Sequence, residues 1–213
     1  INGATLRANN SVFRPCDLNK TWRGLVFENN SSLPETGIIN ECTFKNALTA
    51  VLVENNATSN SSYISNVRLT NNLFSNCKAG VVFENITIEK AITGNTFQVD
   101  NDKPSFFVDC PKSDVIGGVY IQDCNILTEI AQNDFVNMAA NWRFQGLRIF
   151  SSSGGSISKN TFVNNENALF MGYSNQISIE GNVISVTSLT STKRSQFSMG
   201  YNNDIRIIGN TFY

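Results

Sequence analysis

Four acidic residues end four short apolar runs of this chain at nearly regular intervals. Glu28, Glu54, Glu84 and Asp109 follow one another at intervals that match the repeat length of coiled chains. If each interval is one turn of a coiled chain, the carboxyl groups of adjacent turns lie about 5 Å apart, which is the separation in a retaining glycosidase. Carboxyl groups two turns apart lie about 10 Å apart, near the upper end of the separations in inverting glycosidases. Stacked like charges also raise the pKa of at least one member, which a general acid requires. The row predicts glycosidic chemistry, with Glu54 and Glu84 as the acid and the nucleophile or base and the outer two tuning or binding.

The same row permits two other interpretations. A charged residue at the end of a strand, followed by a turn asparagine such as Asn29, Asn55 or Asn85, is typical of a solvated corner. Carboxylates in a row are also ligands that calcium prefers. Calcium is therefore the one cofactor that the sequence permits, and no other metal or cofactor is expected.

Aromatic and cationic residues add candidates for substrate binding. Tyr173 and Tyr201 are separated by one such interval, so one turn of chain would stack them as a platform for the apolar face of a sugar, unless both pack under a loop. Trp142 could form a groove wall, although a lone tryptophan also fits a core or cap. Arg148 could pair with a sugar carboxylate, with Asp134 as the alternative partner.

Composition excludes several classes of function. The chain has 213 residues, 16 basic and 17 acidic residues and a net charge of -1, so nothing favours nucleic acid as a partner. It contains no apolar run long enough to span a bilayer as a helix, so no membrane insertion is expected. It contains no histidine, which removes histidine-based triads and histidine-ligated metal sites. Its five cysteines form no C-x-x-C pair and are interpreted as small buried thiols of a protein assembled under reducing conditions.

A corner motif recurs along the chain and predicts the fold. An aliphatic residue is followed three positions later by Asn or Cys, and two positions further by Phe or Ile. Its eight copies are 39–44, 69–74, 92–97, 121–126, 130–135, 157–162, 179–184 and 207–212. Apart from one short step, between the copies that begin at 121 and 130, the steps have the period of a solenoid. One of the two copies at the short step must belong to another face.

A second set of short apolar runs supplies the other strands. The runs are bounded by Asn, Ser and Gly, and they lie at 24–28, 50–54, 80–84, 105–109, 146–150 and 168–172. Nothing sustains the period of a helix. The pattern predicts an all-β, right-handed parallel β-helix of about eight coils, with the corner asparagines stacked into a ladder. We expect residues 1–23 to lead into or cap the β-helix and residues 24–213 to form it, as a piece of a longer chain.

The corner motif resembles that of the pectate-lyase-like β-helix superfamily. The copies that carry the resemblance most clearly contain Asn95, Asn160 and Asn210, each followed by Thr and Phe. The resemblance covers residues 24–213 and implies the fold more than the function, since the superfamily includes lyases, hydrolases, epimerases, adhesins and bacteriophage tailspikes. The polygalacturonase pattern, with its paired aspartates and His-Gly, and the pectate-lyase pattern, with its Trp-x-Asp-His segment, are both missing.

Three functions remain open at this point. The resemblance and the acid row together predict a tailspike-like depolymerase, a glycoside hydrolase that binds and cleaves a bacterial surface polysaccharide. The alternatives are a non-catalytic adhesin or fibre shaft that binds glycan, and a secreted bacterial polysaccharide lyase or epimerase with Lys or Arg as the base. A tailspike implies a homotrimer, and the expected location is the virion tail or the extracellular space.

Overall fold

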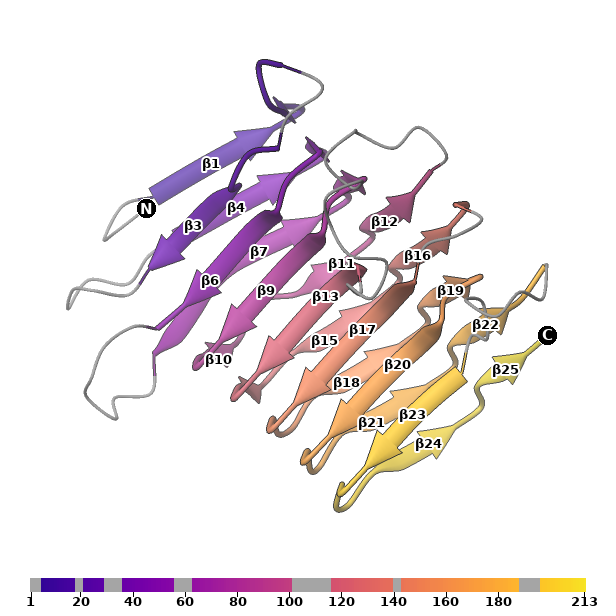
Figure 1. Cartoon of the computed structure of the whole chain (residues 1–213). Helices are drawn as coiled ribbons and strands as arrows, with labels where there is room; N and C mark the ends of the chain where they lie inside the picture. The colour runs from indigo at the N-terminus through magenta and orange to yellow at the C-terminus, as the bar shows by residue number, and fades with distance from the viewer. Residues whose placement is uncertain are drawn as a thin grey trace.

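The structure is a coil of short parallel strands. The computed structural model describes residues 5–17, 21–28, 36–55, 63–100, 116–139, 143–187 and 196–213, and the elements in these ranges are twenty-five strands and no helix. The strands form three parallel sheets stacked along one axis (Figure 1). The predicted right-handed parallel β-helix is therefore confirmed. Among the described residues there is accordingly no helix that could span a membrane.

Each sheet takes one strand from each successive coil. The seven-stranded sheet contains β3 (Leu25–Glu28), β6 (Thr49–Glu54), β9 (Ala79–Glu84), β13 (Ile116–Gln122), β17 (Phe144–Phe150), β20 (Asn167–Gly172) and β23 (Gln196–Gly200). The eight-stranded sheet contains β2 (Val12–Phe13), β5 (Thr43–Lys45), β8 (Leu73–Ser75), β12 (Thr96–Val99), β16 (Asp134–Asn137), β19 (Thr161–Val163), β22 (Val183–Ser185) and β25 (Thr211–Phe212).

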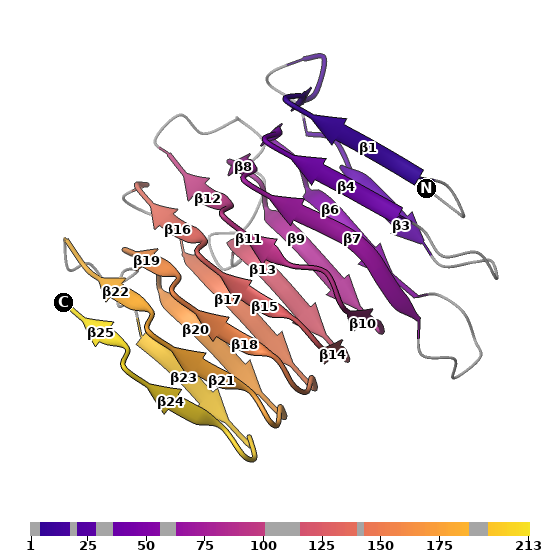
Figure 2. The ribbon, with the colours of Figure 1, turned by 180° about the vertical axis from the view of Figure 1, so that it is seen from behind.

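The third sheet forms the opposite side of the molecule, which Figure 2 shows in front. Its main path contains β1 (Thr5–Asn9), β4 (Thr36–Asn40), β7 (Ile64–Thr70), β11 (Ile92–Thr93), β15 (Glu129–Ala131), β18 (Ser156–Ser158), β21 (Ser178–Glu180) and β24 (Arg206–Ile208). Two short strands, β10 (Thr87–Ile88) and β14 (Asn125–Ile126), lie off this path and make the sheet ten-stranded. Strands β1 and β2 pair with β4 and β5, so the leading segment predicted at 1–23 already supplies strands to two sheets.

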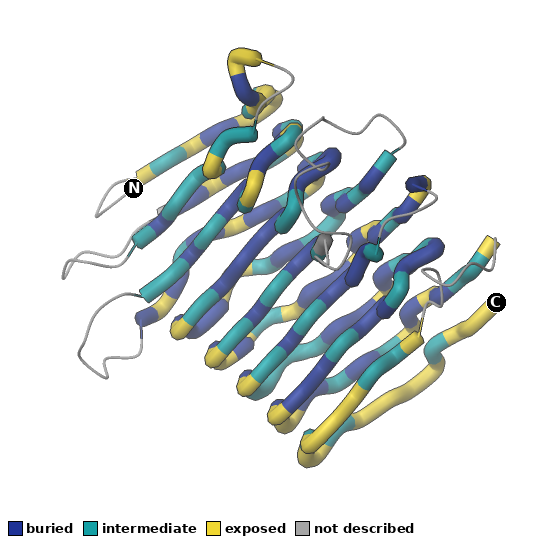
Figure 3. Tube along the Cα trace, in the orientation of Figure 1, coloured by how far each residue is buried: buried dark blue, intermediate teal, exposed yellow. Residues whose placement is uncertain are grey.

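The core is a column of stacked side chains inside the coil. Phenylalanine rings from β5, β8, β12, β16 and β19 stack with centroids 4.7 to 5.0 Å apart, and the rings are Phe44, Phe74, Phe97, Phe135 and Phe162. All are buried. Figure 3 shows the dark-blue buried positions running through successive coils, while the last coil, with β24 and β25, is largely exposed. The motif position occupied by Phe thus fills the interior, as the repeat predicts.

The predicted asparagine ladder is confirmed and joins the coils at one corner. From Asn95 onward, the side-chain Oδ1 of each ladder residue accepts both the backbone N–H and the side-chain Nδ2–H of the asparagine one coil before it, at 2.8 to 3.1 Å. The members are Asn72, Asn95, Asn133, Asn160, Asn182 and Asn210. Cys42 begins the series, because its N–H donates to Asn72 Oδ1 at 2.9 Å.

A second, shorter ladder at another corner explains the irregular step of the repeat. The Cys124 N–H donates to Ser152 Oγ at 3.1 Å, the Ser152 N–H to Ser174 Oγ at 3.3 Å, and the Ser174 N–H to Asn202 Oδ1 at 2.9 Å. Cys124 follows β13 of the seven-stranded sheet, whereas the asparagine ladder lies between the other two sheets. The motif copy at 121–126 therefore belongs to another face, as the short step predicts.

The cysteines of the described residues are free thiols. Cys42, Cys77 and Cys124 are buried, in agreement with the sequence, whereas Cys16 is exposed and departs from the expectation. Cys110 lies outside the described residues. Burial raises the pKa of both the Cys77 and the Cys124 thiol to about 12, so these two groups stay neutral at physiological pH.

Candidate functional site

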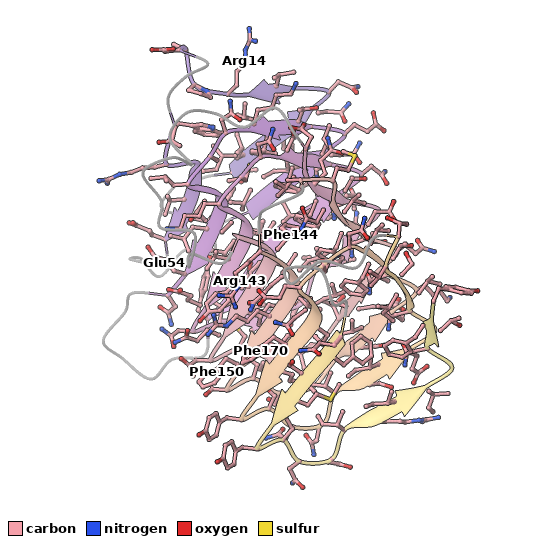
Figure 4. The ribbon with its side chains drawn as sticks, turned by 45° about the vertical axis from the view of Figure 1, so that its right-hand side comes forward. Arg14, Glu54, Arg143, Phe144, Phe150 and Phe170 are labelled. Carbon is pink, nitrogen blue, oxygen red and sulfur yellow. The ribbon has the colours of Figure 1, made fainter. Side chains whose placement is uncertain are left out.

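The outer face of the seven-stranded sheet carries columns of side chains that are held in register from coil to coil. The middle column contains Leu52, Val82, Tyr120, Arg148 and Phe170. The end column, two residues further along each strand, contains Glu28, Glu54, Glu84, Gln122 and Phe150. These side chains alternate along their strands with buried ones such as Phe27, Val53 and Phe83. Figure 4 labels Glu54, Phe170 and Phe150 along this side of the molecule.

Three of the four predicted acids lie side by side in the end column. Glu28 pairs with Glu54 and Glu54 with Glu84 in the strand register, so neighbouring members are about one strand spacing, ~4.8 Å, apart at their backbones. The fourth place is held by Gln122, which pairs with Glu84. The alignment of Asp109 with the row is therefore corrected, and Asp109 itself lies outside the described residues.

Glu84 has the most perturbed carboxyl of the row. Partial burial raises its pKa above the ordinary value, and the negative charges of Glu54 and Asp123 raise it further. Asp123 directly follows Gln122, whose Nε2 donates to Asp123 Oδ2 at 3.1 Å and whose Oε1 accepts the Tyr120 hydroxyl at 2.6 Å. A carboxyl with a raised pKa beside an ionised one is the arrangement that separates a general acid from a nucleophile.

A groove of about 330 Å³ lies beside Glu84 on the same face. Its lining combines an apolar floor with a few polar groups, and includes Leu52, Val82, Glu84, Tyr120, Gln145 and Arg148. Mixed linings of this kind are typical of sites that take an amphipathic ligand such as a sugar. Glu54 is one coil away from Glu84 and is not part of the lining.

Arg148 lies in the groove between two aromatic rings. Its guanidinium carbon is 5.0 Å from the centroid of Tyr120 and 5.3 Å from that of Phe170, which precede and follow it in the middle column. Its Nε is buried without a hydrogen-bond partner. No carboxylate of the described residues, Asp134 included, forms an ion pair with it. The rings therefore hold a cation in the groove without neutralising its charge.

Arg143, five residues earlier, is in the opposite situation. Its Nε donates to both carboxylate oxygens of Glu166 at 2.9 and 2.8 Å, and its terminal nitrogen donates to one of them at 2.6 Å. This bidentate pairing raises the pKa of Arg143 and balances its charge with a carboxylate. Trp142 lies outside the described residues, so its predicted place in the groove wall stays a prediction.

Tyr173 and Tyr201 form the stacked pair that their spacing predicts. Their ring centroids are 5.1 Å apart at 9°, and Phe150 meets Tyr173 edge-on at 5.2 Å. They are 57% and 84% exposed, so neither ring is packed under a loop. Both have positive φ angles, 53° and 55°, in the left-handed region that bulky residues rarely adopt. The same corner position is left-handed in the preceding coils, at Asn85, Asp123 and Ser151, so the turn sets this backbone conformation and the exposed, stacked rings are the feature that suits binding.

The tyrosine pair continues the line of the acid row. Glu84, Gln122, Phe150 and Gly172 are register partners on successive strands, and Tyr173 directly follows Gly172. Three strand spacings, about 14 Å, thus separate Glu84 from the first tyrosine along the axis. The row, the groove and the tyrosines together form one elongated surface that suits a polymer better than a small molecule.

The described residues offer no ready metal centre. Nowhere in these ranges do three or more acidic or cysteine side chains converge as a metal site requires. The acids of the end column are instead distributed one to a coil.

Sequence reasoning missed Tyr120 and Phe170, which enclose Arg148. Both are outward-facing residues of strands whose apolar composition predicts only buried side chains. The signal that identifies them is the alternation within β13 and β20, which becomes readable once 116–122 is recognised as a strand in register with β9.

The fold and the groove define the molecule as a parallel β-helix protein with an elongated surface site on one sheet. No family model matches the chain, and neither the curated proteins nor the solved structures yielded a match.

Proposed function

We propose that this protein binds a bacterial surface polysaccharide along the outer face of the seven-stranded sheet and hydrolyses it with Glu84 and Glu54. The observation that carries the proposal is the position of Glu84, which lines the groove, has a raised pKa and is paired in register with a second carboxyl. A spacing of about one strand suits the two carboxyl groups of a retaining glycoside hydrolase.

The two glutamates take different roles in this mechanism. Glu84 is the general acid, because its raised pKa keeps a proton available for the leaving oxygen. As the glycosidic bond breaks, that proton moves to the leaving oxygen, and the ionised Glu54 forms an ester with the anomeric carbon. Water then attacks that carbon and releases Glu54, while the Glu84 carboxylate accepts the proton of the water. Glu28, one coil beyond Glu54, adds negative charge to the end of the row.

The remaining residues of the surface bind and orient the polymer. Arg148, a cation without an ion-pair partner among the described residues, favours a glycan that carries carboxylates. Tyr173 and Tyr201 offer aromatic surface to the apolar face of a sugar about 14 Å or more from the reacting bond.

The finer assignment is to the pectate-lyase-like superfamily and, within it, to a tailspike-like depolymerase. It is supported by the corner motif and by the β-helix, whose asparagine ladder lies between the eight- and ten-stranded sheets while the candidate groove lies on the seven-stranded sheet. Such a protein would act as a homotrimer on the virion tail or in the extracellular space. Light scattering of the purified protein tests the trimer separately from the activity.

Two alternatives keep a specific observation in their favour. Asn85 follows Glu84 with a positive φ of 56°, as at a solvated corner, and this supports a non-catalytic adhesin or fibre shaft that only binds glycan. Arg148 in the groove supports a polysaccharide lyase or epimerase, in which a basic side chain removes a proton from a uronate.

Product analysis separates the three functions. Purified capsular polysaccharide and lipopolysaccharide are incubated with the protein, and new reducing ends, unsaturated uronate absorbance and anomeric configuration are measured. The proposal expects reducing ends of retained configuration without unsaturated uronate. Unsaturated uronate would establish a lyase instead, and binding without any product would establish the adhesin.

A further inference from the structure

The ten-stranded sheet carries a second candidate site, on the face opposite the acid row. Two adjoining hollows of about 450 and 410 Å³ lie over its first three strands and share Ile38 and Arg68 in their linings. The first also contains Arg7 and the second Lys90. Among the described residues, the two linings contain three cationic residues and no acidic residue, in a chain whose net charge is -1.

The register fixes how the charges are spaced. Arg7 pairs with Ile38 on β4, and Ile38 pairs with Arg68 on β7, so the two arginines are two strand spacings, about 10 Å, apart with an apolar side chain between them. Both arginines and Lys90 are exposed. Arg7, Ile38 and Arg68 belong to one column of outward-facing register positions on this sheet. The next charged residue in that column is Glu129, two strands beyond Arg68.

Within the described ranges, no carboxylate pairs with these cations, Arg7, Arg68 and Lys90. The guanidinium groups of Arg7 and Arg68 can each donate two hydrogen bonds to an anionic group. Because Ile38 lies between them, they suit a polymer that carries repeated anionic groups and places a sugar ring over Ile38.

Neutral donors complete the groove. Thr70 Oγ1 donates to Asn40 Oδ1 at 2.8 Å, and Asn40 Nδ2 donates to Asn9 Oδ1 at 2.8 Å. This chain of hydrogen bonds uses the Asn9 oxygen as an acceptor and leaves its amide N–H groups as donors at the rim of the first hollow.

We propose that this basic groove, formed by Arg7, Ile38, Arg68 and Lys90, is a binding site for an anionic polysaccharide, with its carboxylate or sulfate groups held by the two arginines. The groove is on a different sheet from Glu84, so the proposal is independent of the hydrolysis proposed above. With three cations and no aromatic side chain among the described residues of either lining, a glycan fits better than a nucleic acid, which requires more phosphate contacts or stacking surfaces.

Calorimetric titration tests the site with three defined polymers. Polygalacturonate supplies carboxylates, dextran sulfate supplies sulfates, and neutral dextran supplies neither. We expect at least one acidic polymer to bind at low salt, about 20 mM, and to weaken steeply at about 500 mM, since the contacts are exposed charges, while neutral dextran does not bind. Which acidic polymer binds more tightly identifies the anionic group.

Point variants locate the binding. Arg68→Gln, which affects both hollows, should weaken binding about tenfold through loss of a charge-assisted contact. Arg206→Gln is the matched control, because Arg206 is an exposed arginine of the same outward column at the far end of the sheet.

Several results would overturn the site. These are absence of binding to both acidic polymers, equal binding of neutral dextran, or equal losses from Arg68→Gln and Arg206→Gln. Tighter binding of a single-stranded DNA oligonucleotide than of either polysaccharide would assign the groove to nucleic acid instead.

Discussion

Replacement of Asn133 by Ala should destabilise the β-helix far more than replacement of an exposed asparagine, because this residue is in the middle of the ladder. Its Oδ1 accepts the Asn95 N–H and the Asn95 Nδ2–H, both at 3.0 Å, and its Nδ2 donates to the Ile92 carbonyl at 2.9 Å. Asn133 is fully buried, so water cannot replace these bonds. The Asn95 Nδ2 keeps the Leu69 carbonyl at 3.0 Å. The Asn160 Oδ1 loses the Asn133 Nδ2–H at 3.1 Å but keeps the Asn133 backbone N–H at 3.0 Å, so two groups lose the partner that the side chain supplies.

The expected loss follows from those two groups. A buried polar group left without a partner costs about 1 to 3 kcal/mol, so the Asn95 N–H and the Ile92 carbonyl together give about 2 to 6 kcal/mol. With a urea dependence of about 2 kcal/mol per molar, a loss of about 3 kcal/mol lowers the unfolding midpoint by about 1.5 M. Urea unfolding followed by circular dichroism measures this shift.

Asn125→Ala is the matched control for the ladder variant. Asn125 is exposed, and its Oδ1 accepts the Ser153 hydroxyl only at the long distance of 3.4 Å, so its loss should shift the midpoint by less than a third as much. Equal shifts for the two variants would refute the conclusion that the buried ladder stabilises the stacking of the coils.

Three further predictions concern titration and strain. Glu54→Gln removes a negative charge and should lower the raised pKa of Glu84, so the alkaline limb of the pH profile of residual glycan binding or cleavage should move to lower pH. The melting temperature near neutral pH should also rise slightly. A pH profile that does not move would contradict the coupling between the two carboxyl groups. Burial raises the pKa of Cys77 and Cys124 to about 12, so as the pH rises the unfolded chain loses the thiol protons at lower pH than the folded chain does. The free energy of unfolding should therefore fall above about pH 9, by about 1.4 kcal/mol per pH unit for each thiol. In urea unfolding at a series of pH values, Cys77→Ala should halve that slope. Tyr201→Asn should relieve a left-handed conformation and raise stability by up to about 1 kcal/mol while weakening polysaccharide binding, and a loss of stability without a change in binding would assign the ring to packing.

The fold could be predicted because its determinants repeat in every coil. Each copy of the corner must present an amide that bonds to the copy before and after it, so Asn95, Asn133 and Asn160 recur at the same place relative to a buried Phe. No such constraint acts on the outward columns. Their residues differ from coil to coil, as in Glu84, Gln122 and Phe150, and only the register brings them together.

The misplaced fourth acid has a similar cause. The run ending at Asp109 looks more like a strand than 116–122 does, because the latter contains Gly117 and Gly118. Gly118 is required by packing: a Cβ there would lie 2.5 Å from the Phe135 ring and 2.6 Å from the Gly146 carbonyl oxygen. The tight packing of successive coils requires a glycine in the strand that ends at Gln122, and the sequence of that strand therefore lacks the apolar, β-branched pattern that predicts a strand.

The central claim is that Glu84 supplies the proton for cleavage of a polysaccharide, and the rate of reducing-end release by Glu84→Gln tests it most directly. The substitution keeps the shape of the side chain and removes its proton chemistry. On a polysaccharide that the parent cleaves, we expect the rate to fall about a hundredfold or more, as it does when a general acid is lost, with binding unchanged. Glu129→Gln, at an exposed glutamate on the opposite sheet, should cleave like the parent. If Glu84→Gln also cleaves at the rate of the parent, Glu84 is not the acid and the row is a solvated corner.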